Sequence, residues 1–200
     1  MLLKLIVATK NKGKVSEIGK ILEGLGVELL SLADLSDIVM PEETGATFEA
    51  NALIKARAIA SATGVAALAD DSGLEVDALG GRPGIFSARY AGPDATDEEN
   101  YLKLLGELEG VPDGKRTARF RCSVAFVASD GVSRVFQGAL EGQIAQGPSG
   151  TGGFGYDPVF YIPSEARTSA ELSPEEKNRI SHRAKALEGF KAYIMAQGGR

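Results

Sequence analysis

Two aspartates, Asp70 and Asp71, stand side by side at the end of a short apolar run, in ALADDSGLEV at 67–76. Successive side chains of a strand point to opposite faces, so the pair cannot share one exposed face while the strand continues. We therefore expect one aspartate to leave the strand where Ser72 and Gly73 permit a turn. Two close carboxylates repel each other and raise one pKa unless a cation joins them. The pair thus indicates a cation site, and a turn or cap aspartate is the alternative interpretation.

Carboxylate oxygens are the metal ligands that this sequence supplies. Its one cysteine, Cys122, and its one histidine, His182, cannot build a zinc site of the usual kind. Glu42 and Glu43, in PEETG at 41–45, add two carboxylates. The ligand type therefore favours a hard cation such as Mg²⁺. A lone cysteine also excludes an internal disulfide, as is typical of a reducing compartment, and the strand pattern makes Cys122 a residue of the core.

A basic loop, TKNKGK at 9–14, lies between an apolar run at 2–9 and a segment with helical spacing. Backbone N–H groups and the dipole at a helix N-terminus attract anions, and Lys10, Lys12 and Lys14 add positive charge. The loop therefore predicts a phosphate site, with a solvated basic loop as the alternative interpretation.

The segment GGFGYD at 152–157 combines glycines with two aromatic residues. Because glycine has no side chain, a planar base could stack on Phe154, which is worth about 1–3 kcal/mol per base. Asp157 could accept hydrogen bonds from ring N–H groups of that base. A β-turn with aromatic residues of the core explains the segment equally well.

Three basic residues near the end of the chain, Lys177, His182 and Arg183, do not fall on one face of an unbroken helix, in which each residue turns ~100°. If all three bind a ligand, the helix must break near Ser181, which would begin a second helix. His182 and Arg183 would then lie at the N-terminal end of that second helix.

A polar stripe is expected on a helix over 47–63, where Thr47, Asn51 and Lys55 lie four residues apart. The opposite side of this helix is apolar and predicts the face that packs on the core. On spacing alone, the polar stripe is a solvated face.

Helical and strand patterns interleave along the chain, which predicts an α/β fold with a mixed sheet. Asp130 and Gly131 follow a strictly alternating strand and predict an antiparallel hairpin. At 200 residues and 44% hydrophobic content, the chain can form one sizeable core or two small lobes. The expected strands that flank these features lie at 2–9, 65–70, 74–79, 117–129 and 157–163.

The net charge of −5 opposes a general nucleic-acid-binding role, which needs a basic face. A few lysines and a metal ion could still bind an anionic small molecule. No apolar run approaches the ~20 residues needed to cross a bilayer. We therefore expect neither a nucleic-acid nor a membrane partner, and a cytoplasmic location.

Taken together, these segments resemble one family, the inosine triphosphate pyrophosphatases, which remove non-standard purine nucleoside triphosphates. The resemblance covers essentially the whole chain, and its five blocks follow one another in the family order. The blocks are IVATKNKGKVSEI (6–18), EETGATFEANALIKA (42–56), ALADDSGLEVDALGGRPGIFSARYAG (67–92), GTGGFGYDPVF (150–160) and AELSPEEKNRISHRAKAL (170–187).

The resemblance implies a single domain over 1–200 with an elongated mixed sheet flanked by helices and two lobes around a central cleft, and it implies a homodimer. The implied activity is Mg²⁺-dependent hydrolysis of inosine, deoxyinosine and xanthosine triphosphates to the monophosphate and pyrophosphate.

By matching positions, Asp71 is implied to act as general base on water. Glu43 and Asp71 are implied to hold Mg²⁺, with Asp70 and Glu42 in support. The residues implied to hold phosphates are Thr9, Lys10, Asn11, Lys12, Gly13, Lys14 and Lys55. Ser72 is implied to touch the substrate. The residues implied to surround the base are Phe154, Gly155, Tyr156 and Asp157 on one wall and Lys177, His182 and Arg183 toward its 6-oxo edge. Lys10 stands where the family has smaller residues, so its own role is open.

Discrimination is expected at the 6-position of the purine, where inosine and xanthosine present a carbonyl acceptor and adenosine an amino donor. An unpaired buried donor costs about 1–3 kcal/mol, so donors from His182 or Arg183 would disfavour adenine. Guanine also has a 6-oxo group, so its exclusion must use the 2-position. One alternative is a pyrophosphatase for modified pyrimidine nucleotides, which the blocks at 154–157 and 181–183 oppose. Another is a non-catalytic nucleotide- or RNA-binding module, which the acidic cluster opposes.

Overall fold

The computed structural model describes residues 3–32, 35 and 38–198. The strands within these residues are β1 (Leu3–Val7), β2 (Val27–Ser31), β3 (Ala66–Val76), β4 (Thr117–Val127), β5 (Ser133–Ile144), β6 (Phe160–Ile162) and β7 (Arg167–Thr168). The α-helices are α1 (Lys12–Leu22), α2 (Phe48–Thr63), α3 (Asp97–Glu107), α4 (Pro174–Ile180) and α5 (His182–Gly198).

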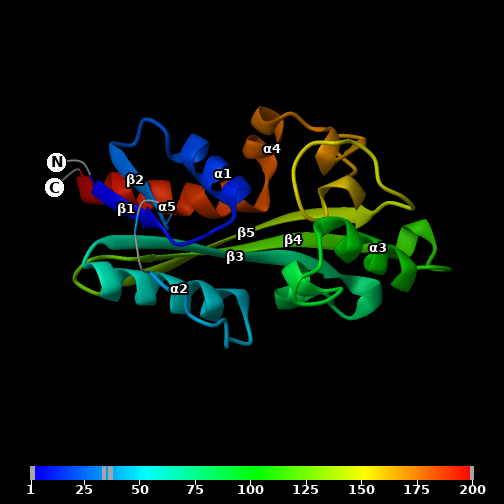
Figure 1. Cartoon of the computed structure of the whole chain (residues 1–200). Coiled ribbons are helices and arrows are strands. Elements are labelled where there is room, and N and C mark those ends of the chain that lie inside the picture. The colour runs from blue at the N-terminus through cyan, green and yellow to red at the C-terminus, as the bar shows by residue number, and fades with distance from the viewer. Residues whose placement is uncertain (1–2, 33–34, 36–37, 199–200) are drawn as a thin grey trace. The chain divides into compact units, whose positions relative to one another are not determined.

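These strands form a mixed sheet in the order β2-β1-β3-β4-β5-β6-β7. β1 pairs in parallel with β2 and β3, whereas β6 pairs antiparallel with β5 and β7. The predicted α/β class with a mixed sheet is therefore confirmed (Figure 1).

The chain divides into two compact units. The first comprises 1–71, 122–138 and 182–200, as far as these residues are described, and the second comprises Ser72–Arg121 and Ala139–Ser181. Strands β3, β4 and β5 each contribute residues to both units.

The first unit has helices on both faces of its part of the sheet (Figure 1). Apolar residues of α1 and α5 pack on one face, against alternate residues of β1 and β3 such as Leu5 and Leu68. Alanines and Ile59 of α2 pack on the other face, against the intervening residues such as Ile6 and Ala69. Each side chain of β3 in this unit is therefore directed to one helical layer or the other.

Strand β3 runs unbroken from Ala66 to Val76, with both aspartates inside it. The predicted turn at Ser72 and Gly73, with separate strands on either side, is therefore wrong. Strand alternation sends Asp70 toward α1 and α5, where Leu68 also points, and sends Asp71 toward α2. Both carboxylates can remain in the strand because the helices on each side supply a cation.

Two of the three residues of the polar stripe, Asn51 and Lys55, are buried, whereas Thr47 is exposed, which corrects the expectation of a solvated face. Asn51 is 0% exposed and Lys55 is 6% exposed. The reason is that the segment at 41–45 packs along this stripe, where the Gly45 N–H donates to Asn51 Oδ1 and Lys55 Nζ donates to Glu43. The predicted N-cap of the helix is confirmed, since Thr47 Oγ1 accepts from the Ala50 N–H at 3.1 Å.

The second unit has an apolar core of its own, built from β3, β4, β5, β6 and α3. The rings of Phe120 and Phe160 lie 4.3 Å apart at its centre. Gly142 of β5 leaves room for the second ring, because an added Cβ would lie 2.6 Å from Phe160 Cζ. This core supports the segment that carries Phe154 and Asp157.

Two local predictions are confirmed. β4 and β5 are neighbours joined by a tight turn, in which the Ala128 N–H donates to the Val132 carbonyl at 2.9 Å. The last helical region breaks as expected: α4 ends at Ile180, Ser181 is extended with ψ of 154°, and α5 begins at His182.

Candidate active site

Asp71 lies on the α2 side of β3 in a cluster with Lys55 and Glu43. Lys55 Nζ donates to Asp71 Oδ1 at 2.9 Å and to Glu43 Oε1 at 2.8 Å, so one cation joins two carboxylates. Asp71 is 7% exposed, and its second oxygen, Oδ2, is buried with no hydrogen-bond partner among the described residues. The cluster therefore holds two negative charges and one positive charge. One carboxylate oxygen, Asp71 Oδ2, is open in the sense that it has no hydrogen-bond partner among the described residues.

The charge imbalance on this side changes the proton affinity of its groups. Burial raises the pKa of Asp71 above its usual value, and the attraction of Lys55 opposes this without cancelling it. Burial alone would lower the pKa of Lys55, but Asp71 and Glu43 outweigh it and raise that pKa. The result is a charged lysine beside a carboxylate that binds protons more readily than an ordinary aspartate, as a general base requires.

Asp70, which precedes Asp71 in the strand, lies in a cluster with the opposite charge balance, in which two cations share this carboxylate. It forms ion pairs with Lys14 of α1 and with Arg183 of α5, whose Nε donates to Oδ2 at 3.2 Å. Arg183 also pairs with Glu17, and the Cys122 thiol donates to Asp70 Oδ2 at 3.2 Å. Burial would raise the pKa of Asp70, but Arg183 and Lys14 hold it well below its usual range. Asp70 therefore favours its ionised form and is the shared counter-ion of two cations, Lys14 and Arg183.

The basic loop at 9–14 is ordered by its own side chains. Helix α1 begins at Lys12, Asn11 Oδ1 accepts from the Lys14 N–H at 3.0 Å, and Thr9 Oγ1 accepts from the Asn11 N–H at 3.2 Å. Lys10 and Lys12 line a cavity of about 480 Å³ next to β2. Lys14 instead points to Asp70. The lysines of this loop thus face two different surroundings within the first unit.

Phe154, Asp157 and Lys177 form a cluster within the second unit. Asp157 Oδ2 accepts from the Phe154 N–H at 2.9 Å and from Lys177 Nζ at 2.6 Å. Lys177 Nζ lies 4.6 Å from the centre of the Phe154 ring. An added Cβ on Gly153, whose φ is +74°, would lie 2.1 Å from Asp157 Oδ2, so the turn requires glycine. The buried carboxylate therefore fixes both the aromatic residue and the lysine above it.

Two neighbours of Phe154 have structural partners of their own. Tyr156 is 4% exposed and its hydroxyl donates to the Ser87 carbonyl at 2.8 Å, so its ring belongs to the core. The Gly155 N–H donates to Asp97 Oδ2 at 2.7 Å. A role of these residues in base binding stays a prediction.

The basic residues at the α4–α5 break are divided between the units. Lys177 joins Phe154 in the second unit, whereas Arg183, fully buried, joins Asp70 and Glu17 in the first. His182 is also buried. The contacts of Arg183 show a role in organising the Asp70 cluster that the sequence analysis did not anticipate, and its expected contact with a purine stays a prediction.

The sequence predicted no role in a site for three residues that contact the clusters or the segment at 41–45: Glu17, Asn51 and Asp97. Glu17 lies three residues after Lys14, a helical spacing that could have placed both on one face of α1. Asn51 was placed on a solvated stripe, and Asp97 has no local signal beyond its position in the first turn of α3.

The fit of a metal can be tested on the α2 side. Among the described residues, no three His, Cys, Asp or Glu side chains gather as a ready-made metal site. Mg²⁺, however, is commonly held by one or two carboxylates, with water and substrate phosphates completing its shell. Glu43 and Asp71 match that donor set. The Lys55 ammonium group bridges their carboxylates and leaves Asp71 Oδ2 without a partner among the described residues.

The family model of the Ham1 family matches residues 5–193, so the chain belongs to this family. It is 54% identical over 98% of its length to a Geobacter sulfurreducens protein named dITP/XTP pyrophosphatase, of which it covers 98%. It is 56% identical, over 94% of its length and 97% of the relative, to a protein of the same name from Halalkalibacterium halodurans. A HAM1 protein structure from Coxiella burnetii matches 97% of this chain and 99% of that chain, with a TM-score of 0.88 and 45% identity.

A helix that crosses a membrane must be long and apolar, and the helices of residues 3–32, 35 and 38–198 were compared with this requirement only in length and hydropathy. None of them combines the length and apolar character that crossing a membrane requires.

Proposed function

We propose that this chain is a nucleoside-triphosphate pyrophosphatase that hydrolyses non-standard purine nucleotides such as dITP, ITP and XTP to the monophosphate and pyrophosphate. Relatives more than half identical over nearly the whole chain carry the name dITP/XTP pyrophosphatase. The observation that carries the proposal is the α2 side of β3, where Lys55 joins Asp71 to Glu43 and leaves Asp71 Oδ2 open.

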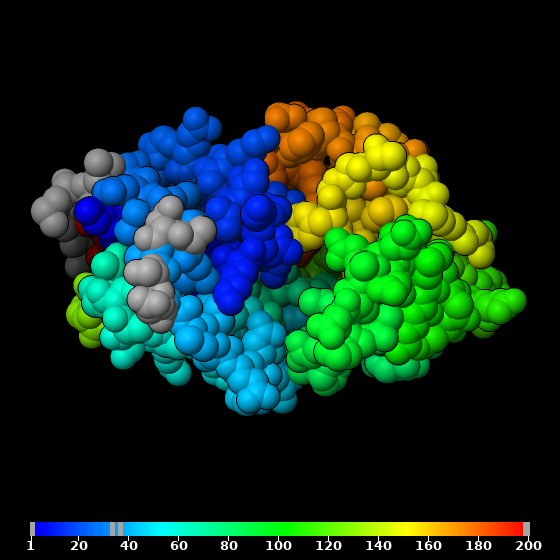
Figure 2. All heavy atoms as spheres, in the orientation of Figure 1, coloured from blue at the N-terminus to red at the C-terminus, as the bar shows by residue number. Residues whose placement is uncertain are grey.

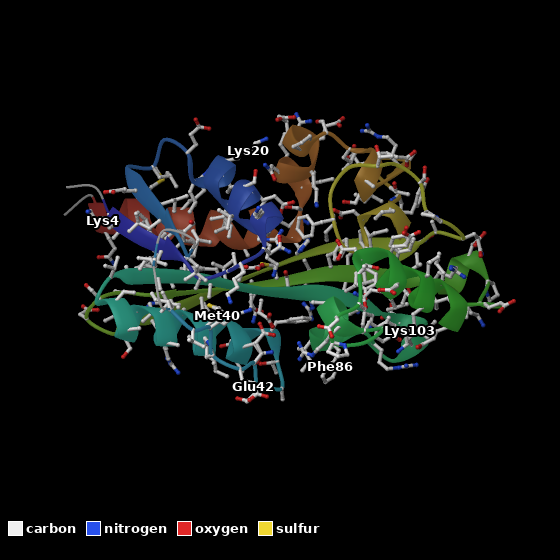
Figure 3. All side chains as sticks on the ribbon, viewed as in Figure 1. Lys4, Lys20, Met40, Glu42, Phe86 and Lys103 are labelled. Carbon is white, nitrogen blue, oxygen red and sulfur yellow. The ribbon has the colours of Figure 1, made fainter. Side chains whose placement is uncertain are left out.

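Glu43 and Asp71 would hold Mg²⁺, with Glu42 and Asp70 in support. When bound, Mg²⁺ supplies positive charge to the phosphate oxygens on which negative charge develops. Glu42 is exposed and points outward in Figure 3, so its support would come through its charge.

Asp71 would act as the general base. Its raised pKa brings it closer to the proton affinity needed to accept a proton from the attacking water, and Oδ2 is the oxygen that has no other partner among the described residues. Lys55 donates to Oδ1 and thereby fixes the orientation of the carboxylate.

Lys14 and Lys55, together with the loop at 9–13, would neutralise the phosphate groups. Lys14 is held by Asp70 in a defined position, so little conformational freedom remains to be lost when substrate binds. Ser72 follows Asp71 directly in β3 and would touch the substrate.

Phe154 would stack on the purine with the ring face that Lys177 does not cover. Lys177, His182 and Arg183 would donate toward the 6-oxo edge, and Asp157 holds Lys177 as a charged donor. This donor set would favour hypoxanthine and xanthine over adenine.

The test is a substrate panel that measures pyrophosphate release from ITP, dITP, XTP, GTP and ATP, with and without Mg²⁺. We expect release from the first three, little from ATP, and none without a divalent cation. Equal turnover of ATP and ITP would reject the specificity. Nucleotide binding that persists without Mg²⁺ and yields no pyrophosphate would reject catalysis.

We also propose that the active form is a homodimer, located in the cytoplasm. Sedimentation equilibrium would give twice the chain mass, and a monomer at micromolar concentration would contradict the proposal.

A further inference from the structure

Asn51 is a polar side chain that α2 buries completely, with 0% of its surface exposed. Its Oδ1 accepts from the Gly45 N–H at 2.8 Å, while its Nδ2 is buried with no hydrogen-bond partner among the described residues. A buried amide that is only half satisfied destabilises a fold. The bond from Gly45 is the hydrogen bond that partly offsets this cost.

Gly45 is fitted to this contact. An added Cβ would lie 2.6 Å from Asn51 Oδ1 and 2.7 Å from Ala50 Cβ. Neither atom is the end of a long flexible side chain, so any larger residue would push the backbone away from α2. The chain at Gly45 thus lies directly against the helix.

This contact controls where Glu43 can lie. Glu43 precedes Gly45 by two residues, and its carboxylate accepts from Lys55, which lies one helical turn after Asn51. Helix α2 therefore holds the segment at two points, the backbone through Asn51 and the carboxylate through Lys55. The Glu43 side chain is 29% exposed, and its segment lies at the molecular surface (Figure 2), so a backbone contact with α2 two residues away limits where its carboxylate can lie.

We propose that Asn51 is a positioning residue that fixes the segment at 41–45 on α2 and thereby holds Glu43 in place to bind a divalent cation together with Asp71. The inference rests on the proposed function, because it extends the proposed metal site to a residue that contacts neither metal nor substrate. Residues that orient metal ligands typically change metal affinity by about 10–100-fold when they are removed.

The experiment compares Asn51→Ala, Gly45→Ala and the double variant with the wild-type chain. Asn51→Ala removes the acceptor and Gly45→Ala displaces the backbone from the opposite side of the same contact. Ile59→Val is the matched control, because it changes a buried residue two turns further along α2. Two readouts are taken: hydrogen exchange of the Gly45 amide without metal, and Mn²⁺ affinity by electron paramagnetic resonance in the presence of inorganic pyrophosphate.

We expect the Gly45 amide to exchange at least about tenfold faster in Asn51→Ala, and Mn²⁺ affinity to fall about tenfold in both single variants. The double variant should bind Mn²⁺ no more weakly than either single variant, because both disrupt one contact. Asn51→Asp keeps an acceptor and should keep the amide protected. Ile59→Val should match the wild-type chain in both readouts.

Wild-type Mn²⁺ affinity in Asn51→Ala, or a loss that Ile59→Val shares, would overturn this inference alone. Additive losses in the double variant would also overturn it. A wild-type chain that does not bind Mn²⁺ would overturn the proposed metal site and this inference with it, so the two failures are distinguishable.

Discussion

Asp70 and Asp71 are neighbours on one strand, equally buried in practice, and yet the two faces of β3 give them opposite chemistry. On the α1 and α5 side, Asp70 has two cations, Lys14 and Arg183, and its pKa falls well below the usual value. On the α2 side, Asp71 shares one lysine with a second carboxylate, and its pKa rises. The comparison teaches that the number of cations on each face, and not burial, decides which aspartate can accept a proton.

The largest expected effect tests the proton-accepting side. Asp71→Asn removes the proposed general base and should lower turnover of dITP by about 10²–10⁴-fold, the usual contribution of such a group. The melting temperature should not fall, because the ionised form of Asp71 is destabilised by burial. Pyrophosphate release and thermal unfolding are measured on the same preparation. Turnover within a few-fold of wild type would contradict the assignment.

Asp70→Asn tests the other face, and here stability should respond most. The substitution leaves the buried Arg183 and the partly buried Lys14 without their shared counter-ion. The expected cost is about 3 kcal/mol, the lower end of such losses, because Glu17 still pairs with Arg183 and Lys14 is partly exposed. Denaturant unfolding measures the free energy, with Asp71→Asn as the matched control. Equal stability of the two variants would break the comparison.

Phe154→Ala sharpens the comparison by leaving both aspartates untouched. It removes the proposed stacking partner of the base, which should weaken dITP binding about 5–150-fold. Turnover at saturating substrate should change much less, since neither face of β3 is altered. A loss confined to kcat, with KM unchanged, would argue against a stacking role.

The smallest expected effect is the pH dependence of stability, for which the two aspartates have opposite signs. Because folding lowers the pKa of Asp70, its ionised form stabilises the fold at pH values above 3.8, the pKa of aspartate in the unfolded chain. This stability is lost as the pH falls through the lower pKa of the folded state. The raised pKa of Asp71 stabilises the fold at low pH, and this contribution is lost as pH rises from 3.8 through the higher folded pKa. Unfolding free energies of the two Asn variants between about pH 2 and 6 should therefore depart from wild type in opposite directions. Parallel curves would contradict these signs.

The sequence predicted those parts of the fold that depend on nearby residues. The hairpin at Asp130, the break at Ser181 and the N-cap at Thr47 all follow from turn, helix and capping chemistry within a few residues. The α/β class follows from the same local patterns.

The path of β3 could not be predicted in this way. Whether Asp70 and Asp71 stay in the strand depends on cations from α1, α2 and α5, which lie far away in the sequence. The burial of Asn51 likewise depends on the segment at 41–45 folding back on α2, which helical spacing does not show. The resemblance to the family implied roles for Asp70 and Asp71, whereas only the structure shows that different cations pair with each of them.

The most direct test is a ¹³C NMR titration of the Asp70 and Asp71 carboxyl groups in the metal-free wild-type protein, with resonances assigned from the two Asn variants. We expect Asp70 to take up its proton only well below pH 3.8 and Asp71 to take up its proton above pH 3.8. Two aspartates that titrate together, or Asp70 protonating first, would contradict it.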